Sequence, residues 1–150
     1  MHLAGRTSNP NSAWVTQQAR QLVWQLNEQP QPIRFLIHDH DTKFSAAFVH
    51  VFMSEGLEIV FTPYQTPKAN AIAERWVRSV REECLDQLLI LNRRHLQHVL
   101  LEYVTFYNCS RPHQGLDQQA PIPFQPSREG RICCRNVLGG HIHDYYRQAA

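Results

Sequence analysis

The spacing of apolar residues along the 150-residue chain predicts four helices and two short strands. Apolar residues recur at helical intervals in residues 13–26, 44–52, 69–91 and 94–107. Two nearly continuous apolar runs, residues 33–37 and 57–61, predict strands, and the first has the composition of a strand covered on both faces. Residues 1–7 also suggest a strand, which ends near Gly5.

Turn-forming residues separate these segments and set their predicted limits. Ser12 is a candidate N-cap for the first helix, and the Pro-rich residues 29–32 would end it. Gly56 would close the second helix, and residues 62–68 form a Pro-containing loop. Because helices and strands alternate along the chain, the expected fold class is α/β.

Composition narrows the class of protein. The chain is 43% hydrophobic and only 19% charged, which is enough apolar material for a packed core and unlike a disordered protein. No apolar run approaches the roughly 20 residues of a membrane span, and the start does not resemble a signal peptide. We therefore expect a cytoplasmic protein without membrane association.

The cysteines fit that expectation. Cys133 and Cys134 are adjacent, which does not suit a disulfide framework. Together with His141 and His143 they match no common zinc-module spacing, so we do not predict a zinc site.

The positions of the charged residues are more informative than the net charge. The net charge is only +2, but six basic residues lie between positions 68 and 94: Lys68, Arg75, Arg78, Arg81, Arg93 and Arg94. Four acids are interleaved with them: Glu74, Glu82, Glu83 and Asp86. On charge alone, a solvated helix face is the better interpretation.

Two carboxylates lie where catalysis could use them. Asp39 follows a predicted strand, and the carboxyl ends of such strands commonly border ligand sites. Glu74 lies near the start of a predicted helix, with Arg78 and Arg81 on the same face. A pair of acids can hold divalent metal ions for phosphoryl transfer, and neighbouring arginines can bind phosphate. Each acid alone is more simply a turn, cap or dipole-stabilising residue.

Three segments favour a catalytic role for these acids over a structural one. Residues 37–44 (IHDHDTKF) resemble the second-aspartate segment of DDE-type insertion-sequence transposases and retroviral-type integrases. Residues 70–76 (NAIAERW) resemble the glutamate segment of that family, and residues 107–116 (YNCSRPHQGL) are similar to the stretch that closes many of these domains. Thirty-four residues separate the two acids, close to the family's spacing, and the segments come in the family's order.

The resemblance implies an RNase H-like fold, in which helices flank a mixed central sheet. It implies DNA transposition or integration, in which transposon ends are cleaved and joined to target DNA. The resemblance also implies that these reactions depend on Mg²⁺ or Mn²⁺ and that the protein acts as a homo-oligomer. Asp39 and Glu74 would be catalytic and metal-binding residues. The expected DNA contacts are Lys68, Asn70, Arg75, Arg78, Arg81, Arg111 and His113. For Arg111 and His113 a second role stays open, namely fixing the loop in which they lie.

Asp41 is the rival to Asp39 for the second acid. The aromatic Phe44 lies five positions after Asp39, as the family's aromatic does after its catalytic aspartate. Counting from Asp41 would also shorten the spacing to Glu74. We therefore favour Asp39 and interpret Asp41 as a turn residue, although it stands where the family often has glycine.

The chain departs from the family at its start. Residues 1–38 contain no Asp, so the family's first catalytic aspartate and first strand have no counterpart. We interpret residues 1–126 as a partial, N-terminally truncated catalytic core and residues 127–150 as a C-terminal tail. A degraded gene and a misplaced start are both compatible with this, and we expect the chain alone to be inactive. The alternative function is a non-catalytic DNA-binding fragment, or one that assembles with an intact transposase and inhibits it.

Overall fold

The computed structural model describes residues 1–28, 32–63, 71–122, 127 and 129–148. The chain divides into two compact units. Residues 4–75 form one, which we call the αβ unit. Residues 76–150 form the other together with residues 1–3, and we call it the helix–hairpin unit. Each is described by itself.

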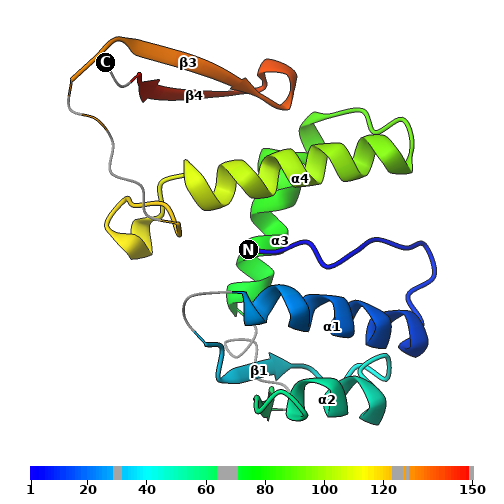
Figure 1. Cartoon of the computed structure of the whole chain (residues 1–150). Coiled ribbons are helices and arrows are strands. Elements are labelled where there is room, and N and C mark those ends of the chain that lie inside the picture. Colours follow the sequence, from blue (N-terminus) through cyan, green and yellow to red (C-terminus); the bar gives the residue numbers. More distant parts are fainter. Residues whose placement is uncertain (29–31, 64–70, 123–126, 128, 149–150) are drawn as a thin grey trace. The chain divides into compact units, whose positions relative to one another are not determined.

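The αβ unit contains two helices and two strands in alternation (Figure 1). In chain order they are α1 (Ser12–Asn27), β1 (Phe35–His38), α2 (Ala46–Met53) and β2 (Glu58–Phe61). The strands pair in parallel, with Leu36 opposite Ile59 and His38 opposite Phe61. The predicted α/β class and the four elements are therefore confirmed for this unit.

The core of the αβ unit lies between the helices and one face of the sheet. Ala19 and Val23 of α1 pack with Phe48 and Phe52 of α2, and Leu36 and Ile59 complete the cluster from the strands. These helix residues follow the predicted apolar spacing.

The opposite face of the sheet is uncovered. Phe35, Ile37 and Val60 are 46%, 60% and 37% exposed. The prediction that the first strand is covered on both faces was therefore wrong. The continuous apolar run did not distinguish a strand buried on one face from a strand buried on both.

Two local boundaries also differ from the predictions. The N-cap of α1 is Asn11, whose side chain accepts a hydrogen bond from the backbone N–H of Trp14, and Ser12 is the first helical residue. Residues 1–7 have no strand structure, because their backbone joins no ladder in the described part of the chain. Instead, the Asn108 side chain donates a hydrogen bond to the carbonyl of Met1 at 2.7 Å, within the helix–hairpin unit.

The helix–hairpin unit is built on two helices that cross (Figure 1). These are α3 (Ala71–Glu83), whose first turn still belongs to the αβ unit, and α4 (Arg93–Cys109). A 3-10 turn, η2 (Leu85–Gln87), separates them. The predicted helix over residues 69–91 was therefore too long, because Cys84 leaves helical geometry (φ −134°) although its side chain continues the apolar stripe.

The core of the helix–hairpin unit is rich in aromatic residues. Val80 and Cys84, at the end of α3, pack with residues on one face of α4. Those residues are Val99, Tyr103 and Tyr107. The ring of Tyr107 also lies against that of Trp76, with 4.6 Å between the ring centroids.

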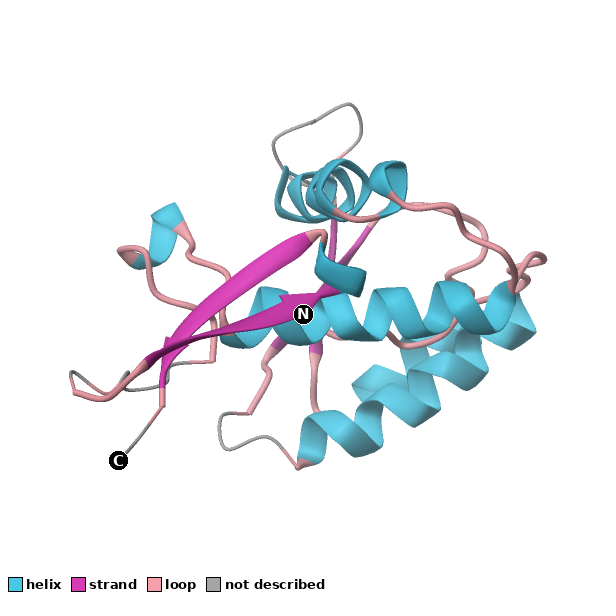
Figure 2. Ribbon diagram, turned by 90° about the horizontal axis from the view of Figure 1, so that it is seen from above, coloured by secondary structure: helices cyan, strands magenta, loops and turns pink. Residues whose placement is uncertain are grey.

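A β-hairpin completes this unit, and the sequence did not predict it. Its strands β3 (Ile132–Val137) and β4 (Ile142–Arg147) are antiparallel and appear as the long magenta pair in Figure 2. Val137 and Leu138 at its tip are buried in the α4 core. The described residues therefore form two separate two-stranded sheets, one parallel and one antiparallel, and do not form the expected single mixed sheet.

Two further observations concern possible membrane spans and the cysteines. No helix in the described residues is long and apolar enough to cross a membrane. The four cysteines, all within the described ranges, are free thiols.

Candidate functional site

The loop after β1 presents Asp39 to solvent. β1 ends at His38, and Asp39 is the next residue and is exposed. Its Oδ1 atom accepts a hydrogen bond from the backbone N–H of Asp41 at 3.1 Å. This side-chain turn holds the carboxylate at the strand end, where the sequence predicted it.

Asp41 is occupied by a different interaction. Its Oδ2 atom accepts a hydrogen bond from the Lys43 ammonium at 2.7 Å, and its Oδ1 accepts from the Lys43 backbone N–H at 2.9 Å. These bonds from Lys43 lower the pKa of Asp41 below its usual value. The local partners of Asp41 are those of a turn residue, which favours Asp39 over Asp41 as the candidate second acid.

His38 anchors the start of this loop. Its Nδ1 lies 2.7 Å from the carbonyl oxygen of Asp39, so Nδ1 carries the proton and donates it. The ring is 7% exposed and lies among Phe44, Phe48 and Phe61, with centroids 4.8 to 5.7 Å apart. The other nitrogen, Nε2, is buried without a hydrogen-bond partner in the described residues. The aromatic surroundings therefore fix the ring that holds the Asp39 carbonyl.

The second candidate acid lies on the exposed side of α3. Glu74 is in the first turn of this helix, where a negative charge is favourable. Arg75, Arg78 and Arg81 follow it, and all four side chains are exposed. Glu74, Arg78 and Arg81 share one helical face, because they stand at i, i+4 and i+7. In the part of the chain that the structure describes, Arg81 has one ion-pair contact, a long one of 3.8 Å between its Nε and Asp86 Oδ1.

The structure does not assemble these predicted residues into a closed metal site. Asp39 and Glu74 lie on different elements, and the described residues contain no group of three or more His, Cys, Asp and Glu side chains that could hold a metal ion. The donor chemistry of the two exposed carboxylates still fits Mg²⁺, which is commonly bound through one or two carboxylates together with substrate phosphates and waters. The predicted DNA contacts Lys68 and Asn70 lie outside the described residues.

Arg111 lies inside a network that the sequence analysis missed. Its Nε donates to Glu83 Oε2 at 2.8 Å, and a second guanidinium nitrogen donates to Glu83 Oε1. The hydroxyl of Tyr103 also donates to Glu83 Oε2, at 2.7 Å. The bond with Glu83 raises the pKa of Arg111, and burial followed by the Glu83 bond raises that of Tyr103.

His113 is held in the same region. Its Nε2 lies 3.1 Å from the carbonyl oxygen of Tyr107, to which it donates, and its ring packs edge-on against Tyr107 at 4.5 Å. Of the two roles left open by the sequence, these contacts favour fixing the loop for both Arg111 and His113. Sequence offered one signal for the network, namely that Glu83 and Tyr103 fall on the buried sides of their helices.

Comparison with known proteins bears on the same segments. Residues 55–121 match the family described as the integrase core domain, a range that includes Glu74, the α3 arginines and Arg111 but not Asp39. The transposase for insertion sequence element IS904 of Lactococcus lactis subsp. lactis (strain IL1403) is 24% identical over 100 residues. That alignment covers 65% of this chain and 40% of the relative, so the chain spans well under half of the relative's length. No solved structure matches the chain.

These findings bear on the class of protein. The integrase core match and the transposase relative together support a catalytic core of the DDE transposase/integrase type, as the three sequence segments predicted.

Proposed function

We propose that this chain is part of an RNase H-like core that breaks and joins DNA strands during transposition. In this proposal residues 1–126 belong to the core and residues 127–150 form a C-terminal tail. Asp39 and Glu74 are two of the acids of the site, and the arginines of α3 bind DNA.

The arrangement of α3 carries the proposal. One helix, inside the segment that matches the integrase core domain, presents Glu74 with Arg78 and Arg81 on one exposed face. Among the described residues, the one ion pair on this face is the long Arg81–Asp86 contact of 3.8 Å, so the charged groups of Arg78 and Arg81 are open to a ligand. A phosphate backbone supplies the charge that such a face lacks.

In this proposal the acids bind the metal ion and the basic residues bind the DNA. Mg²⁺ or Mn²⁺, when bound, would activate the attacking water or 3′-hydroxyl and stabilise the leaving oxygen. Asp39 and Glu74 would hold the ion, and His38 would keep the Asp39 loop in place through the Asp39 carbonyl. The arginines Arg75, Arg78 and Arg81 would position the phosphodiester. Lys68 and Asn70 would also contact DNA, and Arg111 and His113 would fix the loop after α4.

DNA binding by α3 is tested with a labelled duplex and fluorescence anisotropy over a salt series. Each lost phosphate contact reduces the slope of log K against log salt by about 0.9. Replacing Arg75, Arg78 and Arg81 together by Ala is expected to weaken binding and reduce that slope by about 2 to 3. Arg20→Ala, at an exposed position of α1, is the matched control and should change neither. Equal salt slopes for the triple variant and the wild type would argue against this helix as the DNA surface.

Metal binding is tested by titrating Mn²⁺ and following its electron paramagnetic resonance signal. Asp39→Asn and Glu74→Gln are each expected to weaken Mn²⁺ binding. The controls are Asp41→Asn, which removes the partner of Lys43, and Glu82→Gln, at an exposed position of the same helix as Glu74. If both controls weaken Mn²⁺ binding as much as the test variants, the assignment of the acids is wrong.

A second candidate function is that of a fragment that does not cleave DNA, and that binds DNA or joins the oligomer of an intact transposase and inhibits it. It is compatible with the described residues, which contain no group of three or more His, Cys, Asp and Glu side chains that could hold a metal ion. A nicking assay on supercoiled DNA with Mg²⁺ or Mn²⁺ separates the two. Metal-dependent nicking that Glu74→Gln abolishes supports the catalytic core, and binding without nicking supports the non-catalytic fragment.

A further inference from the structure

A pocket lies between the end of α4 and the β-hairpin, and its lining includes none of the residues proposed for catalysis. Its volume is about 530 Å³, within the usual range for small-molecule sites of roughly 300–1,000 Å³. The lining comes from the C-terminal end of α4, the turn at residues 118–120 and both strands of the hairpin. We call it the hairpin pocket.

Its floor is a connected polar cluster. Asp144 Oδ2 accepts a hydrogen bond from the Ser110 hydroxyl at 2.9 Å and another from the guanidinium of Arg135. The same guanidinium donates to Ser110 Oγ at 3.2 Å. The Asp144 side chain is only 12% exposed, whereas that of Arg135 is 55% exposed, so the guanidinium is the part that a ligand can reach.

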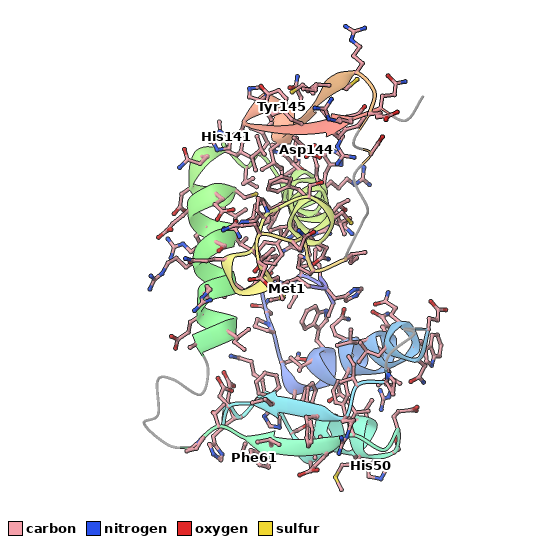
Figure 3. The ribbon with its side chains drawn as sticks, turned by 90° about the vertical axis from the view of Figure 1, so that its left-hand side faces the viewer. Met1, His50, Phe61, His141, Asp144 and Tyr145 are labelled. Carbon is pink, nitrogen blue, oxygen red and sulfur yellow. The ribbon has the colours of Figure 1, made fainter. Side chains whose placement is uncertain are left out.

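One wall of the pocket is aromatic. Figure 3 shows Asp144 and Tyr145 as neighbours on β4, beside α4 seen end-on. Side chains alternate along a strand, so Ile142, Asp144 and Tyr146 share one face. Ile142 packs against the α4 core and Asp144 bonds to Ser110, which places Tyr146 on the pocket side. Tyr146 lines the pocket and is still 43% exposed, so part of its ring is open to a ligand.

The opposite wall is a turn held in an uncommon conformation. Asp117 and Gln118 are consecutive non-glycine residues with positive φ, 50° and 63°. Such backbone persists where the surroundings fix it and is frequent at ligand sites. Here the backbone N–H of Gln118 donates to the carbonyl of His113 at 3.0 Å, and that of Gln119 donates to Leu116 at 2.8 Å. The turn therefore brings two residues with amide side chains, Gln118 and Gln119, into the lining of the pocket.

The hairpin around the pocket carries positive charge. Residues 130–147 contain three arginines and one acid, so their formal charge is +2 with neutral histidines, three minus one. Arg131 and Arg147 lie outside the pocket lining, at the open end of the hairpin. A polyanion that follows the hairpin would thus meet basic residues next to the recessed polar and aromatic groups.

We propose that the hairpin pocket accepts one unpaired nucleobase of a DNA strand. Tyr146 stacks on the base, as aromatic residues do in single-strand sites. The amides of Gln118 and Gln119, with Arg135, offer both donors and acceptors to the edge of the base. Arg131 and Arg147 contact the adjoining phosphates. The inference rests on the proposed function, because it assumes that the chain binds DNA.

The chemistry of the pocket selects among possible ligands. A base within a duplex is stacked on both sides, so only an unpaired or extruded base can enter a recess. A free phosphate would meet the Asp144 carboxylate beside Arg135, which is unfavourable. An acidic peptide would use the arginines but leave the aromatic wall and the two amides without a matching group.

The test compares two duplexes that differ by a single unpaired 2-aminopurine. Binding of the full chain to each labelled duplex is measured by anisotropy, and stacking is followed by quenching of the 2-aminopurine fluorescence. We expect the duplex with the unpaired base to bind about tenfold more tightly, with quenching. Tyr146→Ala is expected to abolish both the preference and the quenching, and Tyr146→Phe to keep both.

Two controls separate the pocket from charge and from folding. Arg78→Ala removes a like charge from the exposed face of α3, outside the pocket lining, so it should weaken both duplexes alike and keep the preference. Far-UV circular dichroism and melting temperature should be the same for Tyr146→Ala and Tyr146→Phe, which confirms that the hairpin is intact in both.

The outcomes also distinguish this inference from the proposed function. Equal affinity for the two duplexes, with no quenching, overturns the inference and leaves DNA binding by α3 standing. A wild-type chain that binds neither duplex overturns both. Preference for the same unpaired base in RNA over DNA, or unchanged quenching by Tyr146→Ala, also overturns the inference as stated.

Discussion

Arg111 and Glu83 form a two-pronged ion pair that joins the last residue of α3 to the segment after α4. The two residues are 28 positions apart, and Tyr103 of α4 adds a third hydrogen bond to the same carboxylate. The pair therefore ties the end of α3 to the segment after α4, within the family-like residues 107–116.

We predict that Arg111→Ala lowers the free energy of unfolding by about 1–2 kcal/mol. The Glu83 carboxylate would keep only Tyr103 as a partner, and both side chains of the pair are about one-third exposed or less, which limits screening by water. The measurement is urea unfolding followed by Trp76 fluorescence, with Trp14 and Trp24 replaced by Phe.

The matched control for this prediction is Arg81→Ala. Arg81 lies 3.8 Å from Asp86, with side chains 67% and 51% exposed, and exposed pairs of this kind contribute at most about 1 kcal/mol. If the two variants lose the same stability, the Arg111–Glu83 pair has no special structural role.

The second prediction concerns acid stability. Burial raises the pKa of Glu83, but the hydrogen bonds from Arg111 and Tyr103 outweigh it, so the folded pKa lies below the ordinary value of 4.5. A carboxyl with a lowered folded pKa stabilises the protein above its unfolded pKa, and this stabilisation disappears as the pH falls through the folded pKa. The difference in unfolding free energy between wild type and Glu83→Gln should be constant above about pH 5.5 and shrink below about pH 4.5. A difference that grows on acidification would contradict this.

The third prediction concerns the cysteines. Burial, assisted by the Glu102 carboxylate, raises the pKa of Cys84 to about 11, and its side chain is fully buried. At pH 8 only about one Cys84 in a thousand would be a thiolate, the form that reacts. Iodoacetamide followed by mass spectrometry should modify exposed Cys134 first and leave Cys84 unmodified until urea is added. Early modification of Cys84 would mean that the α3–α4 core opens readily.

The fourth prediction concerns the attachment of the β-hairpin. Leu138 is 5% exposed in the α4 core, and its backbone N–H donates to Glu102 Oε1 at 2.9 Å. Leu138→Ala should cost about 2–5 kcal/mol and speed hydrogen exchange of the β3 and β4 amides. Ile132→Ala, at a 61% exposed position of β3, should leave exchange nearly unchanged. Equal exchange in the two variants would show that the tip does not attach the hairpin.

Sequence predicted those elements whose signals are local. The helices α1 and α4 show apolar spacing, although their caps are Asn11, where Ser12 was predicted, and Asn92, which was not predicted. The turn that presents Asp39 was equally visible, because its hydrogen bonds join residues two positions apart.

The features that were missed depend on distant contacts. The residues that follow α3, such as Cys84, pack against the same face of α4 as the helix itself. The apolar spacing therefore continues beyond the last helical residue, and periodicity could not show where the helix ends. The hairpin has no clear alternation of apolar and polar residues, and its tip is held by α4. The partner of Arg111 was likewise set by tertiary structure.

The uncovered face of the β1–β2 sheet affects how the protein behaves in the laboratory. Phe35, Ile37 and Val60 place apolar area in water on a chain with a net charge of only +2. Sulfate strengthens the association of such surfaces because it is excluded from them. The protein should therefore precipitate at modest ammonium sulfate concentrations, and Ile37→Lys should raise that solubility limit without entering the core.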